Sequence, residues 1–547
     1  MDRGDTRCNR TPGRLLCRFL NETTILILTV SAAVSLLNAG DHAICGESGS
    51  VPNVVLILAD DMGWSDLGCY GGEISTPNLD SLAAGGLRFS QFHNTAKCFP
   101  SRAALLTGVY AQQCGMNDRP GFIRNAVTLG EVLRANGYRT LMVGKHHGQE
   151  NPFDRGFDRY FGLRDGCCNY FNPGLQRPGE GAPAHKAGKF SPRTWCIDDR
   201  VFEPYTPKEK DFYTTDYFTK YALQYIEQYK DENRPFFLYL AYTAPHDPLQ
   251  AWPEDIAKYR GRYMDGFETI RRARYERQRR SGLIDESFPL SEPTYRDWNS
   301  LSEEEKRRQD EIMAVYAAMI DRLDQNIGKV LDKLAELGLR RNTLIMFASD
   351  NGCAQGGVAK PTSYNPGATT TGKVGSMTRW TKITESWANV SNTPFRYFKC
   401  DAHKGGTCTP LIVNWPEGIK NPGRVVHAPG HFIDFMPTIV EVTGAEYPTN
   451  FNGQKIVPMQ GRSLVPFFSK RPPRPRGPLF WQYSSGKAVR DGHWRLVSDN
   501  GRPWELHDMR TDKTETRDVI SKHPEIARRM KSMYKQWLAE ANAAEQP

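Results

Sequence analysis

The sequence predicts an α/β fold, in which buried strands form a sheet covered by helices and a smaller C-terminal unit follows. Three observations support this class. Continuous aliphatic runs, such as residues 54–59, are typical of strands buried on both faces of a sheet. Residues 302–338 carry apolar side chains at helical spacing, which predicts a long amphipathic helix. Short segments near residues 480, 488 and 495, in which apolar and polar residues alternate, indicate antiparallel strands.

The composition is that of a globular protein with a sizeable core. The 547 residues are 39% hydrophobic and 11% aromatic, enough for one large domain with an appendage or for two to three domains. A formal net charge of +9 is small for this length and does not indicate a nucleic-acid partner. We predict a main domain at residues 51–445 and a C-terminal subdomain at 446–547.

Residues 1–43 have the order of a secretory signal peptide. Arginines precede an apolar run at residues 25–37, and the small residue Ala39 follows it. The run is short for a membrane span, which favours a cleaved signal peptide. An uncleaved N-terminal anchor is the alternative. Both readings predict an exported protein, periplasmic or extracellular. Two of the 12 cysteines fall in this segment, and we expect one or a few disulfides among the others.

The strand predicted at residues 54–59 ends in two adjacent carboxylates, Asp60 and Asp61. The C-terminal ends of parallel strands are where open α/β sheets place their ligands. Two neighbouring carboxylates repel each other, so such a pair is usually held by a cation. A solvated Asp-Asp turn is the alternative for a bare pair.

Three further predicted strands end in polar residues in the same way. Lys145, His146 and His147 follow the strand at 138–144, and His246 follows the strand at 235–242. A third pair, Asp350 and Asn351, follows the strand at 343–348. Because four strand ends all carry metal-binding or acid/base side chains, we expect them to converge on one site.

A helix is predicted to begin at Cys98, since Pro100 suits a first helical turn and an apolar run follows. Backbone N–H groups at such a helix start favour negative charge, and Arg102 lies one turn further on. A buried cysteine before an ordinary helix is the plainer reading of these residues alone.

Two stretches of different composition complete the main domain. Residues 150–210 show no clear period and are predicted to be long loops over the sheet. Residues 258–280 are strongly basic, which favours a solvated helix face; steering of polyanionic substrates toward the site is the alternative.

The residues from Cys98 to Gly108 resemble the sulfatase signature Cys-x-Pro-Ser-Arg-x-x-x-Leu-Thr-Gly at every fixed position. The Asp60-Asp61 pair, a Lys-x-His at 145–147, a Pro-His at 245–246 and Lys399 also match this family. The chain therefore resembles the type I, formylglycine-dependent sulfatases, in an arylsulfatase-like, secreted bacterial form. It departs from the pattern at His146, usually aromatic, and at Lys404, where glutamate is usual.

This resemblance implies the alkaline-phosphatase-like fold, a mixed sheet sandwiched by helices with a small C-terminal antiparallel sheet plus helix. It implies hydrolysis of sulfate esters, either aryl sulfates or sulfated carbohydrates including polysaccharides. Cys98 would be converted to formylglycine by a formylglycine-generating or sulfatase-maturating enzyme. Calcium, or alternatively magnesium, would be bound by residue 98 together with the oxygen ligands Asp60, Asp61, Asp350 and Asn351.

The resemblance also assigns catalytic roles. His246, together with Lys399, would protonate the departing alcohol, and His147 would take the proton from the second hydroxyl of the hydrated aldehyde. Arg102 and Lys145 would stabilise the formylglycine and the sulfate charge. Two other functions stay open: a phosphate or phosphonate ester hydrolase on the same fold, and a catalytically silent protein that binds sulfated glycans.

Overall fold

The computed structural model describes residues 50–185, 193–356, 372–469 and 475–545. These described residues form one compact unit. The signal segment at 1–43 lies outside the described residues, and the domain boundary at 446 stays a prediction. Among the described helices, none is both long and apolar enough to cross a membrane.

The largest element is a mixed, 11-stranded sheet with the order β10-β2-β9-β8-β1-β7-β3-β4-β5-β6, in which β11 pairs with β2. Its centre, β8-β1-β7-β3, is parallel throughout, whereas β9 runs antiparallel to both β8 and β2. The strands are β1 (Asn53–Ala59), β2 (Leu87–His93), β3 (Arg139–Gly144), β4 (Arg159–Leu163), β5 (Trp195–Ile197), β6 (Arg200–Phe202), β7 (Phe236–Ala241), β8 (Thr343–Ser349), β9 (Cys408–Asn414), β10 (Arg424–Val426) and β11 (Gly430–His431).

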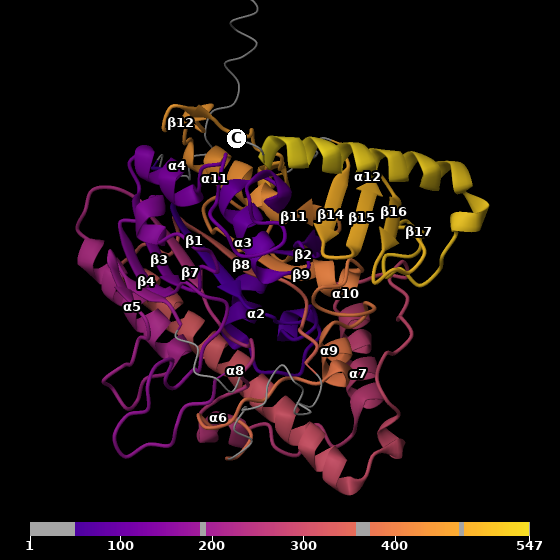
Figure 1. The fold of residues 1–547 in the computed structure, drawn as a ribbon, viewed down its shortest axis with the longest axis horizontal. Coiled ribbons are helices and arrows are strands. Elements are labelled where there is room, and N and C mark those ends of the chain that lie inside the picture. The colour runs from indigo at the N-terminus through magenta and orange to yellow at the C-terminus, as the bar shows by residue number, and fades with distance from the viewer. Residues whose placement is uncertain (1–49, 186–192, 357–371, 470–474, 546–547) are drawn as a thin grey trace, which may run out of the picture. The chain divides into compact units, whose positions relative to one another are not determined.

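Helices cover both faces of this sheet, as the sequence predicts (Figure 1). Helices α2, α5 and α8 pack together on one face, and α3, α4 and α11 on the other. The helices are α2 (Pro77–Ala84), α3 (Cys98–Thr107), α4 (Leu129–Ala135), α5 (Thr214–Tyr229), α6 (Pro253–Ala257), α7 (Phe267–Arg280), α8 (Glu303–Glu336), α9 (Glu385–Ser391), α10 (Lys404–Thr407), α11 (Phe435–Thr443) and α12 (Pro524–Glu545).

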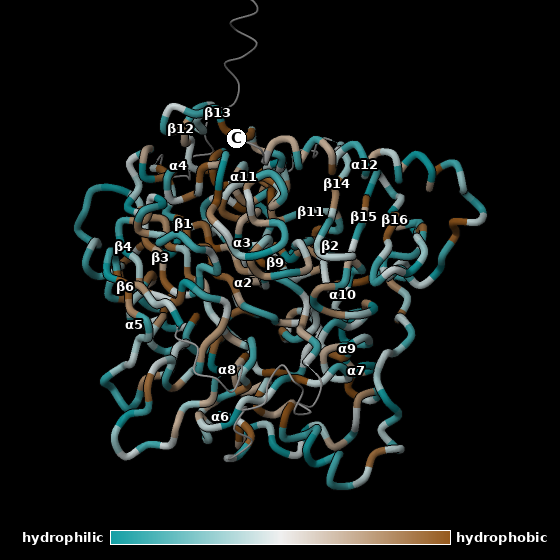
Figure 2. The backbone as a smooth tube through the Cα atoms, viewed as in Figure 1, coloured by the Kyte–Doolittle hydropathy of each residue, from teal (hydrophilic) through white to brown (hydrophobic). Residues whose placement is uncertain are grey.

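Strand β1 shows why the central strands carry unbroken aliphatic runs. Val55, Ile57 and Ala59 belong to the core shared with α2, α5 and α8, and the alternate residues are equally buried on the other face. Side chains of a strand point alternately to opposite faces, so a strand covered on both sides must be apolar at every position. Figure 2 shows the apolar residues running through the central strands, with hydrophilic residues mainly on the outlying loops.

The C-terminal part forms a separate antiparallel sheet, which confirms the predicted sheet plus helix. Its order is β14-β15-β16-β17, and α12 lies across it (Figure 1). These strands are β14 (Leu479–Tyr483), β15 (Gly486–Asp491), β16 (Trp494–Ser498) and β17 (Glu505–Asp508); a short hairpin of β12 (Asn450–Phe451) and β13 (Gln454–Lys455) precedes them.

Three expectations require correction. Residues 150–210 are not only loops, because β4, β5 and β6 lie there and extend the edge of the main sheet. The expected disulfides are absent from the described residues, where no two of the nine cysteines are joined by a disulfide. The basic stretch is neither a solvated face nor a steering surface throughout, since Arg271 and Arg274 of α7 are buried.

Candidate active site

The four predicted polar strand ends meet at one edge of the sheet. The strands that carry them, β8, β1, β7 and β3, are parallel neighbours in that order. Their carboxyl ends therefore lie side by side, which is the position where open α/β sheets bind ligands. The convergence that the sequence predicts is confirmed.

Asp60 and Asp61 leave the end of β1 in different directions. Asp61 adopts a left-handed backbone conformation with φ of 66°, which non-glycine residues rarely occupy. Side chains hold the backbone amides that follow: Met62 N–H donates to Ser349 Oγ of β8 at 3.0 Å, and Gly63 N–H donates to Asp66 Oδ2 of the same loop at 2.8 Å. This support allows adjacent residues to present both carboxylates to the site.

Each carboxylate is paired with its own lysine. Lys145 Nζ lies 2.6 Å from Asp60 Oδ2, and Lys399 Nζ lies 2.5 Å from Asp61 Oδ1. Burial raises the pKa of Asp60 well above its ordinary value and outweighs the opposing effect of Lys145. Burial acts on Asp61 in the same direction, but His246 and Lys399 outweigh it and lower the pKa of Asp61.

Asp350 and Asn351, at the end of β8, join the same cluster. Asp350 Oδ2 accepts a hydrogen bond from Arg102 Nε at 2.9 Å and forms an ion pair with Arg102 Nη2 at 2.8 Å. Arg102 Nη1 also donates to the Lys145 carbonyl at 2.9 Å. Asn351 Nδ2 donates to Asp61 Oδ1 at 2.7 Å. Arg102 therefore contacts both Asp350 and the backbone just after β3. Burial acts to lower the pKa of Arg102, but the nearby Asp350 carboxylate opposes burial, and the net shift is upward.

Three oxygens in this cluster are buried and have no hydrogen-bond partner among the described residues. They are Asp60 Oδ1, Asp61 Oδ2 and Asn351 Oδ1, which belong to three of the predicted metal ligands. Unpaired buried oxygens, two of them on neighbouring carboxylates, are unfavourable unless a cation or a donor meets them. The donor set thus fits a hard divalent cation such as Ca²⁺ or Mg²⁺.

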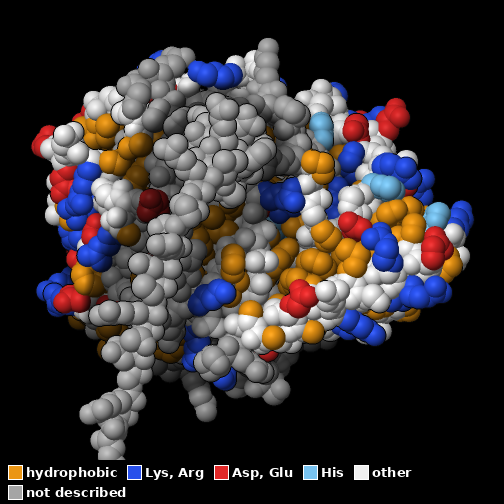
Figure 3. Space-filling model, turned by 90° about the horizontal axis from the view of Figure 1, so that it is seen from above, with side chains coloured by type: hydrophobic (Ala, Val, Ile, Leu, Met, Phe, Trp, Pro, Cys, Tyr) orange, Lys and Arg blue, Asp and Glu red, His pale blue; other side chains and the backbone are white. Residues whose placement is uncertain are grey.

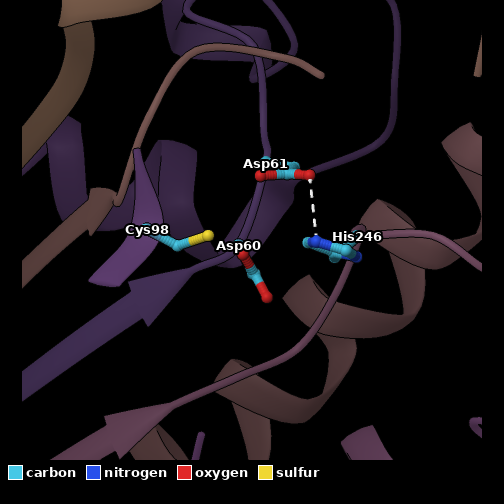
Figure 4. Close-up of side chains that lie close together, drawn as sticks. All are labelled: Asp60, Asp61, Cys98 and His246. Carbon is cyan, nitrogen blue, oxygen red and sulfur yellow. Dashed lines mark ion pairs between the residues drawn. The ribbon is translucent and has the colours of Figure 1, made fainter. Parts of the chain in front are cut away.

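Cys98 is the first residue of α3 and is 1% exposed. Its sulfur belongs to a group with Asp60, Asp61 and His246 whose ligand atoms all lie within 4.8 Å of one another (Figure 4). Burial raises the pKa of the thiol, but Lys145, Lys399 and Lys97 together reverse the effect and lower it. The helix start and these cations favour a negatively charged group at this position.

A cavity of about 460 Å³ opens onto Cys98. His147 and His246 both line it. His246 Nδ1 lies 2.7 Å from the Asp247 carbonyl, and its Nε2 lies 3.5 Å from Asp61 Oδ2. Burial lowers the pKa of His246 to about 3 although Asp61 opposes the shift, and burial also lowers that of His147 well below its usual value.

The structure shows which of the neighbouring histidines, His146 or His147, faces the site, a question that the sequence leaves open. His146 does not line this cavity; its Nε2 lies 3.6 Å from Glu150 Oε1. His147 adopts a left-handed conformation with φ of 65° and packs edge-on against the Phe99 ring. His147 is therefore the histidine that shares the cavity with Cys98.

Several supporting residues carry no sequence signal that would single them out. Arg274 of α7 lies 2.6 Å from Asp66 Oδ1, and Tyr316 of α8 donates to Asp66 Oδ2 at 2.7 Å. The Tyr316 hydroxyl also lies 3.3 Å from the Asp61 carbonyl. Because Asp66 accepts the Gly63 amide as well, this group braces the loop that presents Asp61.

The structure also shows the surroundings of Lys404, the second departure from the family pattern. The Glu515 carboxylate accepts the Lys404 backbone N–H at 2.7 Å and pairs with Arg495 at 2.5 Å. A glutamate from the C-terminal part therefore provides a negative charge beside Lys404. The Lys404 ammonium is buried, which together with Arg490 lowers its pKa to about 7.

Comparisons with known proteins agree with this geometry. The sulfatase family model matches residues 52–445, and the model of the N-sulphoglucosamine sulphohydrolase C-terminal region matches residues 396–543. An arylsulfatase of Klebsiella aerogenes is 33% identical over 80% of this chain and 95% of its own length. An uncharacterized sulfatase of Schizosaccharomyces pombe is 32% identical over 89% of this chain and 93% of its own.

Among solved structures, Ps i-CgsB in complex with a neocarrahexaose superposes with a TM-score of 0.65 at 26% identity, covering 91% of this chain and 94% of the other. The match to the family model spans the main sheet and every predicted site residue. The chain therefore belongs to the sulfatase family of enzymes, which hydrolyse sulfate esters.

Proposed function

We propose that this sulfatase hydrolyses sulfate esters through a formylglycine made from Cys98, with a divalent cation bound beside it. The observation that carries the proposal is the position of Cys98, buried at the start of α3 within 4.8 Å of ligand atoms of Asp60, Asp61 and His246. When formed, the hydrated aldehyde of formylglycine supplies the nucleophile.

Asp60, Asp61, Asp350 and Asn351 would hold the cation together with residue 98. All four offer oxygen ligands, which suit Ca²⁺ or Mg²⁺ better than Zn²⁺. When bound, the cation supplies positive charge for the sulfate oxygens and for the nucleophile. The family assignment supports this chemistry over phosphate ester hydrolysis and over a silent glycan-binding role.

The remaining roles follow from what each side chain contacts. Arg102 holds the Asp350 carboxylate in place through a hydrogen bond from Nε and an ion pair at Nη2, so Asp350 is oriented to accept a proton from the attacking hydroxyl. Lys145 places positive charge beside Asp60 and Cys98. His147 lines the cavity beside Cys98, where it would accept the proton of the second hydroxyl of the hydrated aldehyde. His246 and Lys399 are the candidates to protonate the leaving oxygen.

The substrate class that we propose is a sulfated carbohydrate or an aryl sulfate. The carrageenan oligosaccharide bound to the related structure supports a carbohydrate. We also propose that the protein is exported, because residues 1–43 have the order of a signal peptide. Because the signature around Cys98 is intact, we further propose that a formylglycine-generating or sulfatase-maturating enzyme acts on the protein. Nucleic acid is not an expected partner, and on the face seen in Figure 3 lysines and arginines lie scattered among acidic and apolar side chains.

Mass spectrometry and turnover test the nucleophile together. Protein produced with a maturation enzyme should contain formylglycine at residue 98 and should hydrolyse 4-nitrophenyl sulfate. Cys98→Ala should remove turnover without loss of the fold, whereas Cys114→Ala, a buried thiol outside the cavity, should keep it. An active preparation that contains only the unmodified thiol would refute the proposed nucleophile.

Metal replacement tests the cation. Chelation should lower both activity and thermal stability, and Ca²⁺ or Mg²⁺ should restore them better than Zn²⁺. The cation should raise the melting temperature of the wild type but not that of Asp60→Asn, which lacks one ligand charge. Rescue by zinc alone would show that the ligand assignment is wrong.

A further inference from the structure

The cavity over Cys98 carries more positive charge than its predicted catalytic residues account for. Besides the two histidines, its charged lining consists of three cations, Lys97, Arg164 and Arg193, and one carboxylate, Asp165. None of these four residues belongs to the predicted metal or catalytic set. The cavity wall therefore has an excess of two positive charges, three cations minus one carboxylate.

Two of these charges, on Arg164 and Asp165, already have partners behind the cavity lining. Arg164 Nη2 lies 3.6 Å from Glu203 Oε1 and donates to Thr194 Oγ1 at 3.3 Å. Asp165 Oδ2 accepts the Thr194 backbone N–H at 2.5 Å. These contacts fix the wall that precedes β5 and leave Arg164 partly neutralised.

Lys97 and Arg193 differ, because neither forms an ion pair with any carboxylate in the described parts of the chain. Lys97 directly precedes Cys98 at the start of α3. Arg193 lies on the wall that leads into β5, with Nη2 4.0 Å from the sulfur of Cys167, which also lines the cavity. Both are only half-exposed, so their charges face the cavity with limited help from solvent.

The single charge of a sulfate monoester does not require these two residues. Lys145 and Lys399, beside Asp60 and Asp61, already place positive charge around Cys98. A guanidinium that lines a cavity and forms no ion pair with a described carboxylate is best satisfied by an anion from the ligand, through charge-assisted hydrogen bonds. We propose that Arg193, together with Lys97, forms a second anion subsite, which selects sulfate esters that carry a further sulfate or carboxylate.

This proposal rests on the proposed function but is tested without turnover. Cys98→Ala protein, loaded with Ca²⁺, is titrated calorimetrically at low salt with N-acetyl-D-glucosamine 6-sulfate and with D-glucosamine 2-N,6-O-disulfate. The two sugars are of nearly equal size and differ by one negative charge. We expect the disulfate to bind roughly tenfold tighter, the worth of one charge-assisted hydrogen bond, and the ratio to fall at high salt.

Variants made in the Cys98→Ala protein locate the effect. Arg193→Gln should bring the affinity ratio of the two sugars close to one, Lys97→Gln should lower it, and Arg193→Lys should retain part of it. The matched control is Arg279→Gln, an exposed arginine of α7 that does not line the cavity. Melting temperatures confirm that each variant is folded.

The outcomes separate the two proposals. Equal affinity for both sugars, no measurable binding of either, or a ratio that survives Arg193→Gln overturns the second anion subsite. Failure of the mature protein to hydrolyse any sulfate ester overturns the proposed function instead, and it leaves the binding ratios readable.

Discussion

At the residue scale, the site shifts the pKa values of two adjacent aspartates in opposite directions. Asp60 and Asp61 are adjacent in the chain, yet burial raises the pKa of one while His246 and Lys399 lower the pKa of the other. The difference arises because the left-handed backbone at Asp61 sends the two side chains to different partners. Adjacent identical residues therefore acquire different charge properties from the elements that surround them.

Replacement of His246 should reveal which group protonates the leaving oxygen. His246→Ala should lower kcat/KM by roughly 10²–10⁴-fold on sugar sulfates and less on 4-nitrophenyl sulfate, because an acid helps most when the leaving oxygen is basic. The control is His146→Ala, a buried histidine outside the cavity.

The same kinetic comparison also tests Lys399, the competing proton donor. If Lys399→Met shows the steeper dependence on the leaving group, the proton comes from Lys399, whose pKa stays high beside Asp61 despite burial. Equal losses on both substrates in His246→Ala would mean that His246 binds the sulfate rather than donating a proton.

At the scale of elements, helix α7 serves the site from a distance. Its arginines make the segment look like a solvated basic face in the sequence, but Arg274 is buried between Asp66 and Glu73, at 2.6 Å and 2.7 Å. Arg277 N–H donates to the Gly71 carbonyl at 2.7 Å. Arg274 and Arg277 therefore tie α7 to the loop after β1.

Arg274→Met should destabilise the protein strongly, because it leaves the buried Asp66 carboxylate without its cation. Removal of one partner from a buried ion pair typically costs about 3–5 kcal/mol in free energy of unfolding. Urea denaturation measures this cost, and Arg279→Gln, on the exposed side of the same helix, should change it little.

A double variant checks the assignment. Arg274→Met combined with Asp66→Asn should be less destabilised than the sum of the single variants, because the unpaired charge is then removed. A loss in Arg274→Met no larger than that in Arg279→Gln would contradict the bracing role.

At the scale of the whole described unit, the C-terminal sheet supports the segment that carries Lys399. Arg495 of β16 donates to the Ala402 carbonyl at 2.7 Å, and Glu515 accepts the Lys404 amide. Trp481 of β14 donates to the Asn94 carbonyl at 2.8 Å, just before the signature. The small sheet and the loop after it thus contact both the stretch just before the signature and the stretch just after Lys399.

His507 makes the stability of this sheet depend on pH. Burial alone would lower the pKa of His507, but Asp512 at 3.3 Å and Glu505 at 3.2 Å raise it to about 9, above its ordinary value of 6.5. A raised pKa means that the folded protein holds this proton more tightly than the unfolded chain does. The stabilisation is complete below pH 6.5 and is lost as the pH rises through 9.

His507→Gln should therefore destabilise the protein by up to about 3 kcal/mol at pH 6 and by much less at pH 10. Urea denaturation across this pH range measures the difference. His493→Gln, a less buried histidine on the turn between β15 and β16, is the control. A difference between His507→Gln and wild type that does not change with pH would refute a charged His507.

The central strands and the signature were predictable because their information is local. A strand buried on both faces must be aliphatic throughout, and the polar residue that ends it marks the sheet edge. The edge strands β4, β5 and β6 were missed because they are short and lie among glycine, proline and charged residues, where no period of two is visible.

The sequence by itself determined the fold class, the family and the residues that meet at the sheet edge, since period, strand ends and the signature are properties of consecutive residues. Only the tertiary structure decided which of His146 and His147 lines the cavity, that Lys404 lies beside Glu515, and that Arg193 lines the cavity at Cys98 with no ion pair to a described carboxylate. These facts depend on contacts between residues far apart in the chain. Burial and Coulomb interactions act on distance in space, and separation along the sequence does not reveal that distance.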